Sequence, residues 1–147
     1  FPRWNAHLYD DKLLEIQNVI STKCEELLNK EVNFNSCLIN YYRNEQDSIK
    51  PHTDSHELFG FNPCICLLSL GEERLIKFTR KKFNQDNIKS LKQDKTCTHL
   101  NKTILLKEGS LLIMDLATQK YYMHEIPKEM NKKNPRWSMT FREFIIS

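Results

Sequence analysis

From Asn33 to its end the chain consists of short apolar runs separated by turn residues, and this pattern constrains the fold more than any other feature. The runs are rich in Ile, Leu, Phe and Tyr, which favour β-strands, and they are too short for typical helices. We expect strands near residues 34–42, 48–52, 64–70, 74–80, 102–107, 110–115, 121–126 and 136–145. Such a series of short strands predicts a mainly β fold, an antiparallel sandwich or barrel.

Residues 11–30 show a different, helical period. Their apolar side chains recur at steps of three and four residues, at Leu13, Ile16, Ile20, Cys24 and Leu27. Asp10 or Asp11 can cap the first turn by accepting a hydrogen bond from its free N–H groups. We therefore expect one amphipathic helix that packs against the larger β part of the molecule, which gives an α+β composition overall.

Turn residues and one apolar run refine the expected strands. Residues 71–73 (Gly-Glu-Glu) fit a hairpin turn, and residues 108–109 (Glu-Gly) fit another tight reversal. The run 64–70 is almost wholly apolar, so we expect it to be buried on both faces. Within this run, Cys64 and Cys66 are expected to fill the core rather than to bind a metal.

The length and composition fit a single globular domain that spans residues 1–147. Five cysteines without a C-x-x-C pair indicate reduced thiols and an intracellular compartment, nucleus or cytoplasm. No stretch approaches the roughly 18 apolar residues that a membrane span needs, so we expect no membrane partner.

Lysine and arginine are unevenly distributed, although the net charge is only +3. They cluster in residues 77–82, 89–95 and 128–136. Residues 81–101 are also polar and weakly patterned, which predicts a long loop that is either functional or mobile. The basic clusters either follow a phosphate backbone or form an ordinary solvated surface.

His52 and Asp54 form an H-x-D pair just after Pro51. Side chains two residues apart on an extended chain point to the same side, so the two can face one metal ion. A third ligand must come from another strand, and His124 lies in the strand-like stretch YYMHEI. Together they have the form of a two-histidine, one-carboxylate triad for iron. The pattern is not specific by itself, because an H-x-D pair with a later histidine also occurs by chance.

The last strand, RWSMTFR, carries a second candidate site. Arg136, Ser138, Thr140 and Arg142 share one face of this strand. Guanidinium groups hold carboxylates through paired hydrogen bonds, so this face fits an anion clamp. The alternative is an edge strand whose polar face is solvated.

The ordered motifs resemble the AlkB family of Fe(II)- and 2-oxoglutarate-dependent dioxygenases. The order is N-x-Y (Asn40 and Tyr42), H-x-D, a late histidine and R-x5-R. The stretches FNSCLINYYRNEQDSI, SLGEERLIKFTRKK, EGSLLIMD and RWSMTFREF are similar to family members that repair nucleic acids. The resemblance covers nearly the whole chain from Phe34 onward.

This resemblance implies a double-stranded β-helix, or jelly-roll, with the N-terminal helix packed on one sheet. It implies that iron is held by His52, Asp54 and His124. It further implies that the carboxylates of 2-oxoglutarate are shared among Asn40, Tyr42, Arg136, Thr140 and Arg142, and that O2 takes the remaining position on iron. The implied reaction couples decarboxylation of 2-oxoglutarate to hydroxylation of an N-methyl group, after which formaldehyde leaves the repaired base of DNA or RNA.

The substrate contacts depart from the family pattern. Relatives place an acidic residue just after the metal-binding aspartate, whereas here His56 and Glu57 occupy that region. We expect one or both to contact the base, with a solvated loop as the alternative. Arg74 matches an arginine that lies beside the substrate in relatives; the alternative is an arginine on the surface of a hairpin. In relatives an aromatic lid follows the stretch that corresponds to residues 1–10. Here the expected helix begins at once at residue 11, so the lid is short or missing, which favours single-stranded substrates.

Two other functions compete with nucleic-acid dealkylation. The same core can serve a 2-oxoglutarate-dependent enzyme that hydroxylates or demethylates a protein side chain. A jelly-roll without chemistry can serve as a nucleic-acid-binding module, although such a module needs neither the triad nor the clamp. In each case we expect a monomer.

Overall fold

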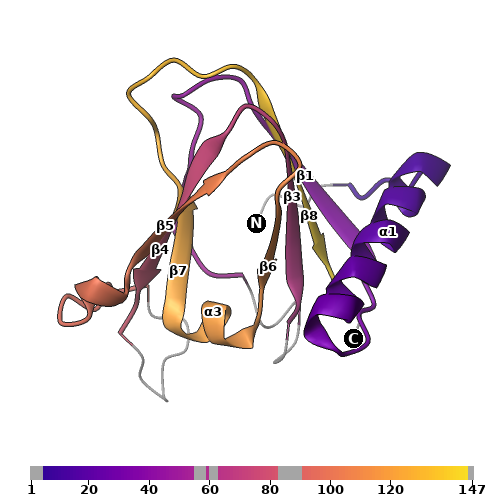
Figure 1. Ribbon diagram of the computed structural model, residues 1–147, viewed down its shortest axis with the longest axis horizontal. Coiled ribbons are helices and arrows are strands. Elements are labelled where there is room, and N and C mark those ends of the chain that lie inside the picture. The colour runs from indigo at the N-terminus through magenta and orange to yellow at the C-terminus, as the bar shows by residue number, and fades with distance from the viewer. Residues whose placement is uncertain (1–4, 55–58, 60–62, 83–90, 146–147) are drawn as a thin grey trace.

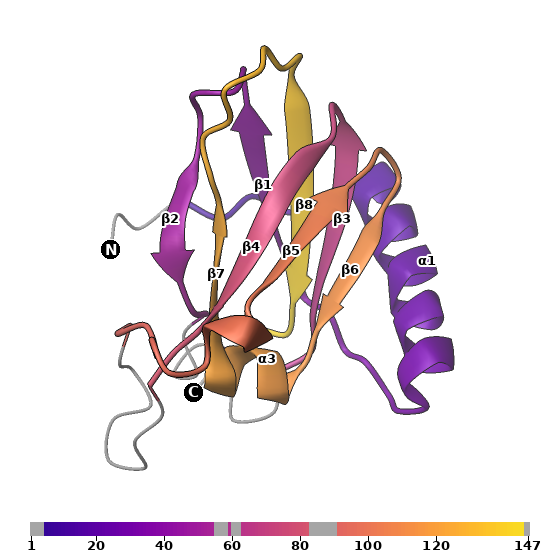
Figure 2. The same ribbon diagram turned by 60° about the vertical axis from the view of Figure 1, so that its left-hand side comes forward.

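The computed structural model describes residues 5–54, 59, 63–82 and 91–145. Its main body is a pair of antiparallel β-sheets that face each other, with helix α1 (Asp11–Leu28) lying outside one of them (Figures 1 and 2). The first sheet has the order β1 (Ser36–Tyr42), β8 (Arg136–Arg142), β3 (Ile65–Gly71) and β6 (Leu111–Met114). The second has the order β2 (Ile49–His52), β7 (Tyr122–Ile126), β4 (Arg74–Arg80) and β5 (Lys102–Leu106).

All eight expected strands are present, with ends that differ from the expected ones by up to three residues. Each strand pair in the two sheets is antiparallel. Two facing four-stranded antiparallel sheets in this order form a jelly-roll. The predicted mainly β fold, with one amphipathic helix on a sheet, is therefore confirmed.

Helix α1 begins where the sequence predicts. The Asp10 side chain accepts a hydrogen bond from Leu13 N at 2.7 Å, so Asp10 and not Asp11 is the cap. The helix ends at Asn29, whose left-handed backbone (φ 50°) is typical of a helix C-terminus. Its apolar stripe packs on the outer face of the first sheet in a cluster made by Ile20, Cys24, Val32, Phe34, Cys66, Met139 and Phe141.

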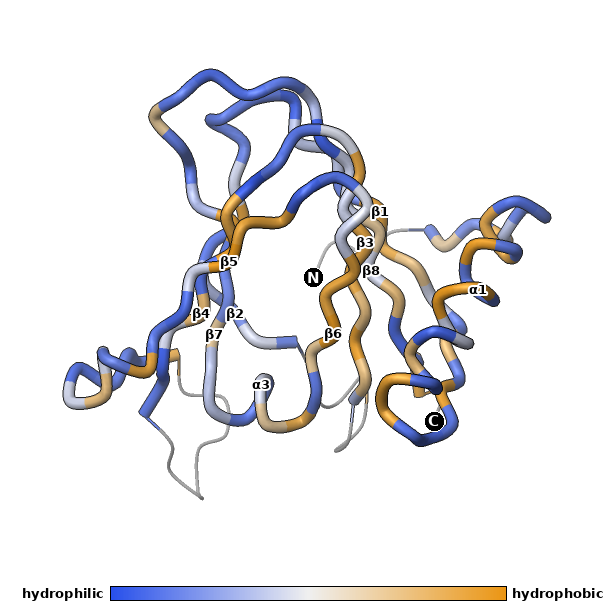
Figure 3. Tube along the Cα trace, in the orientation of Figure 1, coloured by the Kyte–Doolittle hydropathy of each residue, from blue (hydrophilic) through white to orange (hydrophobic). Residues whose placement is uncertain are grey.

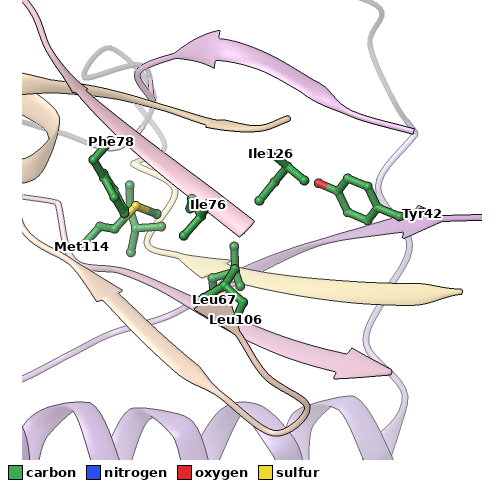
Figure 4. Packing of buried hydrophobic residues seen from close by; sticks show 8 residues of the cluster. Tyr42, Leu67, Ile76, Phe78, Leu106, Met114 and Ile126 are labelled. Atoms are coloured by element: carbon green, nitrogen blue, oxygen red, sulfur yellow. The ribbon is translucent and has the colours of Figure 1, made fainter. Parts of the chain in front are cut away.

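The main core lies between the two sheets. Figure 4 shows its apolar side chains in a row, with the hydroxyl of Tyr42 directed toward Ile126. In Figure 3 strand β6 is largely hydrophobic, whereas the connections at the upper end of the sheets are hydrophilic. The run 64–70 is buried or nearly so, as predicted, and Cys66 is a core residue. All five cysteines are free.

Three features were not predicted. A short helix, α3 (Leu116–Tyr121), closes the end of the sandwich between β6 and β7 (Figure 1). It is capped by Asp115, which accepts a hydrogen bond from Thr118 N at 3.0 Å. A 3-10 turn, η1 (Thr98–Leu100), lies in the β4–β5 connection, and Lys81 is buried there.

Among the described helices, none combines the length and apolar content that a membrane crossing requires.

Candidate metal and anion site

Strands β2 and β7 bring the two candidate histidines together. His52, the last residue of β2, is the register partner of His124 on β7. Their ring centroids are 4.3 Å apart. The antiparallel pairing therefore places two residues that are distant in sequence on neighbouring strands, as the predicted triad requires.

Asp54 completes the group from the segment that follows β2. One carboxylate oxygen, Oδ1, lies 3.7 Å from His52 Nε2, and the other, Oδ2, accepts a hydrogen bond from Arg142 Nε at 2.7 Å. The ligand atoms of His52, Asp54 and His124 all lie within 4.8 Å of one another. Within the described part of the chain, this is the one group of three or more His, Cys, Asp or Glu side chains close enough to hold a metal ion.

The protonation states suit metal binding. His52 Nδ1 lies 2.9 Å from the Lys50 carbonyl oxygen, and a donor at Nδ1 leaves Nε2 with a free lone pair. Burial and the neighbouring His52 lower the pKa of His124 to about 4, so its imidazole is neutral at physiological pH. Burial acts to raise the pKa of Asp54, but the Arg142 guanidinium outweighs it and holds that pKa below its usual value.

Polar side chains of β1 and β8 lie next to this group. The two strands pair so that Asn40 faces Ser138 and Tyr42 faces Arg136. These side chains point between the sheets, while Met139 and Phe141 of β8 pack against α1 on the other face. The alternative of an edge strand with a solvated polar face is wrong, because β8 lies between β1 and β3 and its polar face is buried.

Arg136 has an unusual environment. Its side chain is 0% exposed, its Nε donates to Ser69 Oγ at 2.9 Å, and its guanidinium carbon lies 5.0 Å from the centre of the Tyr42 ring. The other two guanidinium nitrogens are buried without a hydrogen-bond partner. Burial lowers the pKa of Arg136, although Tyr42 partly offsets this. A buried cation with free donors is the arrangement that binds an anion.

A cavity of about 70 Å³ lies between the two candidate histidines and the polar side chains of β1 and β8. It is lined by Leu38, Asn40, Tyr42, Ile49, His52, Leu67, Ile76, Met114, His124, Ile126, Ser138, Thr140 and Arg142. Six of the predicted residues, on four different strands, thus surround one space, whereas Asp54 and Arg136 do not line it. Apolar side chains from the main core form much of the remaining wall.

Arg74 does not line this cavity, and its predicted substrate contact stays a prediction. The side chain is 1% exposed and donates from Nε to Glu129 Oε2 at 2.8 Å. Its terminal nitrogens donate to the main-chain carbonyls of Asn44, Asp47 and Pro127 at 2.8–3.0 Å. The alternative of a surface hairpin arginine is wrong, because the side chain is almost fully buried. Arg74 instead connects the β1–β2 and β7–β8 loops to the start of β4 through these hydrogen bonds.

His56 and Glu57 lie outside the described residues. Gln119 of α3, which is not predicted as a site residue, accepts a hydrogen bond from Asp54 N at 2.9 Å. The sequence carries no signal for this contact, because a single glutamine in a short segment has no diagnostic spacing.

Comparisons with known proteins agree with this geometry. A sequence profile of the 2OG-Fe(II) oxygenase superfamily matches residues 2–142. Alpha-ketoglutarate-dependent dioxygenase alkB homolog 3 is 41% identical in Bos taurus and 40% in Homo sapiens, each over 74% of this chain and 36% of the relative. DNA oxidative demethylase ALKBH2 of Arabidopsis thaliana is 32% identical over 74% of this chain and 37% of the relative.

The chain therefore spans little more than a third of the length of these relatives. A solved structure, described as the structure of OsALKBH1, matches with a TM-score of 0.57 over 92% of this chain and 66% of the other. Since the two sequences are only 15% identical, this match supports the fold alone.

Proposed function

The chain belongs to the 2OG-Fe(II) oxygenase superfamily, and from this premise we propose that it removes alkyl groups from the bases of DNA or RNA by oxidation. Two kinds of similar proteins support the proposal, the alkB homolog 3 dioxygenases and the DNA oxidative demethylases named ALKBH2. The resemblance of the ordered motifs to the AlkB family supports the same activity.

The observation that carries the proposal is a complete set of metal ligands whose two histidines share a cavity with Tyr42, together with two unpartnered buried nitrogens of Arg136, whose guanidinium lies over the Tyr42 ring. The imidazoles of His52 and His124 and the carboxylate of Asp54 are the donor set that suits iron(II). The two buried donors of Arg136 lack an acceptor, and a carboxylate of 2-oxoglutarate supplies one. The residues therefore fit both groups.

The proposed roles follow from this fit. His52, Asp54 and His124 hold Fe(II), and the carboxylates of 2-oxoglutarate are bound by Asn40, Tyr42, Arg136, Thr140 and Arg142. When bound with O2, the iron and the cosubstrate supply the oxidising power that hydroxylates the N-methyl group, with succinate, carbon dioxide and formaldehyde as the products.

The side chains of this chain orient the reactants rather than react themselves. Arg142 holds one oxygen of Asp54, which leaves the other oxygen directed at the histidines. The apolar wall formed by Leu67, Ile76 and Met114 limits the water near the site. Such preorganisation favours oxidation of the bound substrate over uncoupled turnover.

We propose single-stranded nucleic acid as the preferred substrate. The aromatic lid that relatives carry after the stretch corresponding to residues 1–10 is short here, and a short lid gives little help in flipping a base out of a duplex. His56 and Glu57 are proposed to contact the base, and the lysine clusters to contact phosphates. We further propose that residues 1–147 act as one catalytic domain, as a monomer, in the nucleus or cytoplasm.

The test begins with anaerobic binding of Fe(II) and 2-oxoglutarate. Oxygen is then admitted with oligonucleotides that carry 1-methyladenine, 3-methylcytosine or N6-methyladenine, in single- and double-stranded form. We expect formaldehyde and a mass loss of one methylene group, greater for single strands. The variant His52→Ala should abolish both, because one ligand of the triad is missing.

Two outcomes would replace this proposal with its competitors. Succinate formation with a peptide library, but no product from any oligonucleotide, would indicate a protein side-chain hydroxylase or demethylase. Oligonucleotide binding that is unchanged in His52→Ala, without any turnover by the unmodified protein, would indicate a binding module.

A further inference from the structure

Gln119 combines a contact to the metal site with a cost in stability. It lies in α3, is 7% exposed, and accepts the main-chain N–H of Asp54 at 2.9 Å through Oε1. Its other amide atom, Nε2, is buried without a hydrogen-bond partner. Because Asp54 N–H can only donate, the amide cannot be turned round to exchange the two atoms.

The stability of the core does not explain this glutamine. Buried donors without partners destabilise a folded protein, and a methionine of similar length fills such a position without that cost. The feature that does explain Gln119 is its one partner. Asp54 follows the end of β2, so no neighbouring strand pairs with its main chain there.

Asp54 is held from two directions. Arg142 of β8 binds its carboxylate, and Gln119 of α3 binds its main chain. Helix α3 leads directly into β7, which carries His124 five residues after Gln119. We propose that Gln119 is a positioning residue for the metal site, which fixes the main chain of Asp54 so that Oδ1 stays beside both histidines. This inference rests on the metal site of the proposed function.

Cobalt(II) binding tests the inference without any catalytic turnover. Competition between the metal-free protein and a chelator, followed by the visible absorption of Co(II), gives the dissociation constant. We expect Gln119→Met to weaken Co(II) binding by about ten- to a hundredfold, the usual effect of losing a contact that orients a metal ligand. The melting temperature of the metal-free protein should change little, because the substitution removes one unpaired donor, Gln119 Nε2, and leaves another, Asp54 N–H, without its acceptor.

Two further variants separate positioning from packing. Gln17→Met makes the same change at a glutamine of α1 that is also 7% exposed and has a buried amide oxygen without a partner, and it should leave Co(II) binding unchanged. Gln119→Asn keeps the amide but is one methylene too short to reach Asp54 N, so it should weaken Co(II) binding as Gln119→Met does. If Gln119→Met does not fold, Gln119→Asn alone decides the matter.

Co(II) affinity within twofold of the unmodified protein in folded Gln119→Met or Gln119→Asn would overturn the inference. An equal loss of affinity in Gln17→Met would also overturn it, since the effect would then be general. Failure of the unmodified protein to bind Co(II) would overturn both the metal site and this role. Tight Co(II) binding without demethylation would overturn the proposed function and leave the role of Gln119 intact.

Discussion

Arg136 shows how a single residue can be placed for a ligand rather than for stability. A buried arginine in a folded protein normally pairs with an acid or spends its donors on carbonyl groups, as Arg74 does here. Among the described residues, Arg136 donates a hydrogen bond to Ser69 alone, and its guanidinium lies over the Tyr42 ring. Its two free nitrogens therefore favour binding of an anion even when no metal ion is bound.

We expect Arg136→Met to abolish the stabilisation of the protein by 2-oxoglutarate while changing the ligand-free stability little. A ligand at a hundred times its dissociation constant stabilises a protein by about 2.7 kcal/mol. Thermal unfolding with Mn(II), with and without 2-oxoglutarate, measures the difference. Arg43→Met, at an exposed arginine paired with Asp47, is the control and should keep the full shift. An equal shift in Arg136→Met would show that the anion binds elsewhere.

The sequence predicts some of these residues better than others. His52, Asp54 and His124 could be grouped in advance because strand alternation and antiparallel pairing decide where their side chains point. The burial of Arg74 and the contact of Gln119 could not, because both depend on loops and a short helix that meet only in the folded chain. A charged residue in a polar stretch is predicted to lie on the surface, because the sequence does not show the partners that would allow its burial.

At the scale of the elements, the strands were predictable and the short helix was not. Each strand has an apolar run bounded by turn residues, whereas the six residues of α3 are too few to establish a helical period. Asp115 is a local signal for the start of a helix, but Tyr121 and Tyr122 favour a strand. Helix α3 is fixed instead by its position between β6 and β7.

The β3–β4 turn places Gly71 against the start of β8. Gly71 has a φ of +90°, and a Cβ atom there would lie 2.6 Å from the Pro135 carbonyl oxygen. Gly109, with a φ of +76°, has nothing within 4 Å of such an atom. Both glycines avoid the strain of a left-handed conformation, but only Gly71 also allows close approach of the main chain next to Arg136.

We expect Gly109→Ala to cost about 1 kcal/mol of unfolding free energy through backbone strain, and Gly71→Ala about 3 kcal/mol because a steric clash is added. Urea unfolding of both variants measures the two losses. Gly71→Ala should also weaken 2-oxoglutarate binding, because Gly71 is the register partner of Arg136. Equal losses in the two variants would contradict the close approach at Gly71.

Arg74 ties the β1–β2 and β7–β8 connections to the start of β4. Removal of one partner from a buried ion pair leaves the other charge uncompensated and typically costs about 3–5 kcal/mol. We expect a loss of this size in Arg74→Met by urea unfolding. Glu129→Gln also leaves a charge uncompensated, that of Arg74, but it keeps an acceptor for Arg74 Nε and the three hydrogen bonds to main-chain carbonyls, so it should lose less. A loss below about 1 kcal/mol in Arg74→Met would indicate that the loops are held by other contacts.

At the scale of the whole molecule, the site exists only where the two sheets meet. The two histidines belong to the second sheet, and Asn40, Arg136 and Thr140 to the first. The hydrogen bond between Arg142 on β8 and Asp54 after β2 links the two sheets at the metal site itself. The site and the packing of the sandwich are therefore expected to respond to each other.

Arg142→Met tests this coupling through its dependence on metal. In the metal-free protein the change leaves the Asp54 carboxylate, which is 5% exposed, without its counterion, and we expect a loss of about 3 kcal/mol in urea unfolding. A bound divalent cation supplies a counterion for the same carboxylate. In the variant, Co(II) also no longer shares Asp54 with the Arg142 guanidinium. The loss of unfolding free energy should therefore be clearly smaller at saturating Co(II). A loss that is as large with Co(II) as without it would mean that Arg142 stabilises the sandwich by packing, independently of the charge on Asp54.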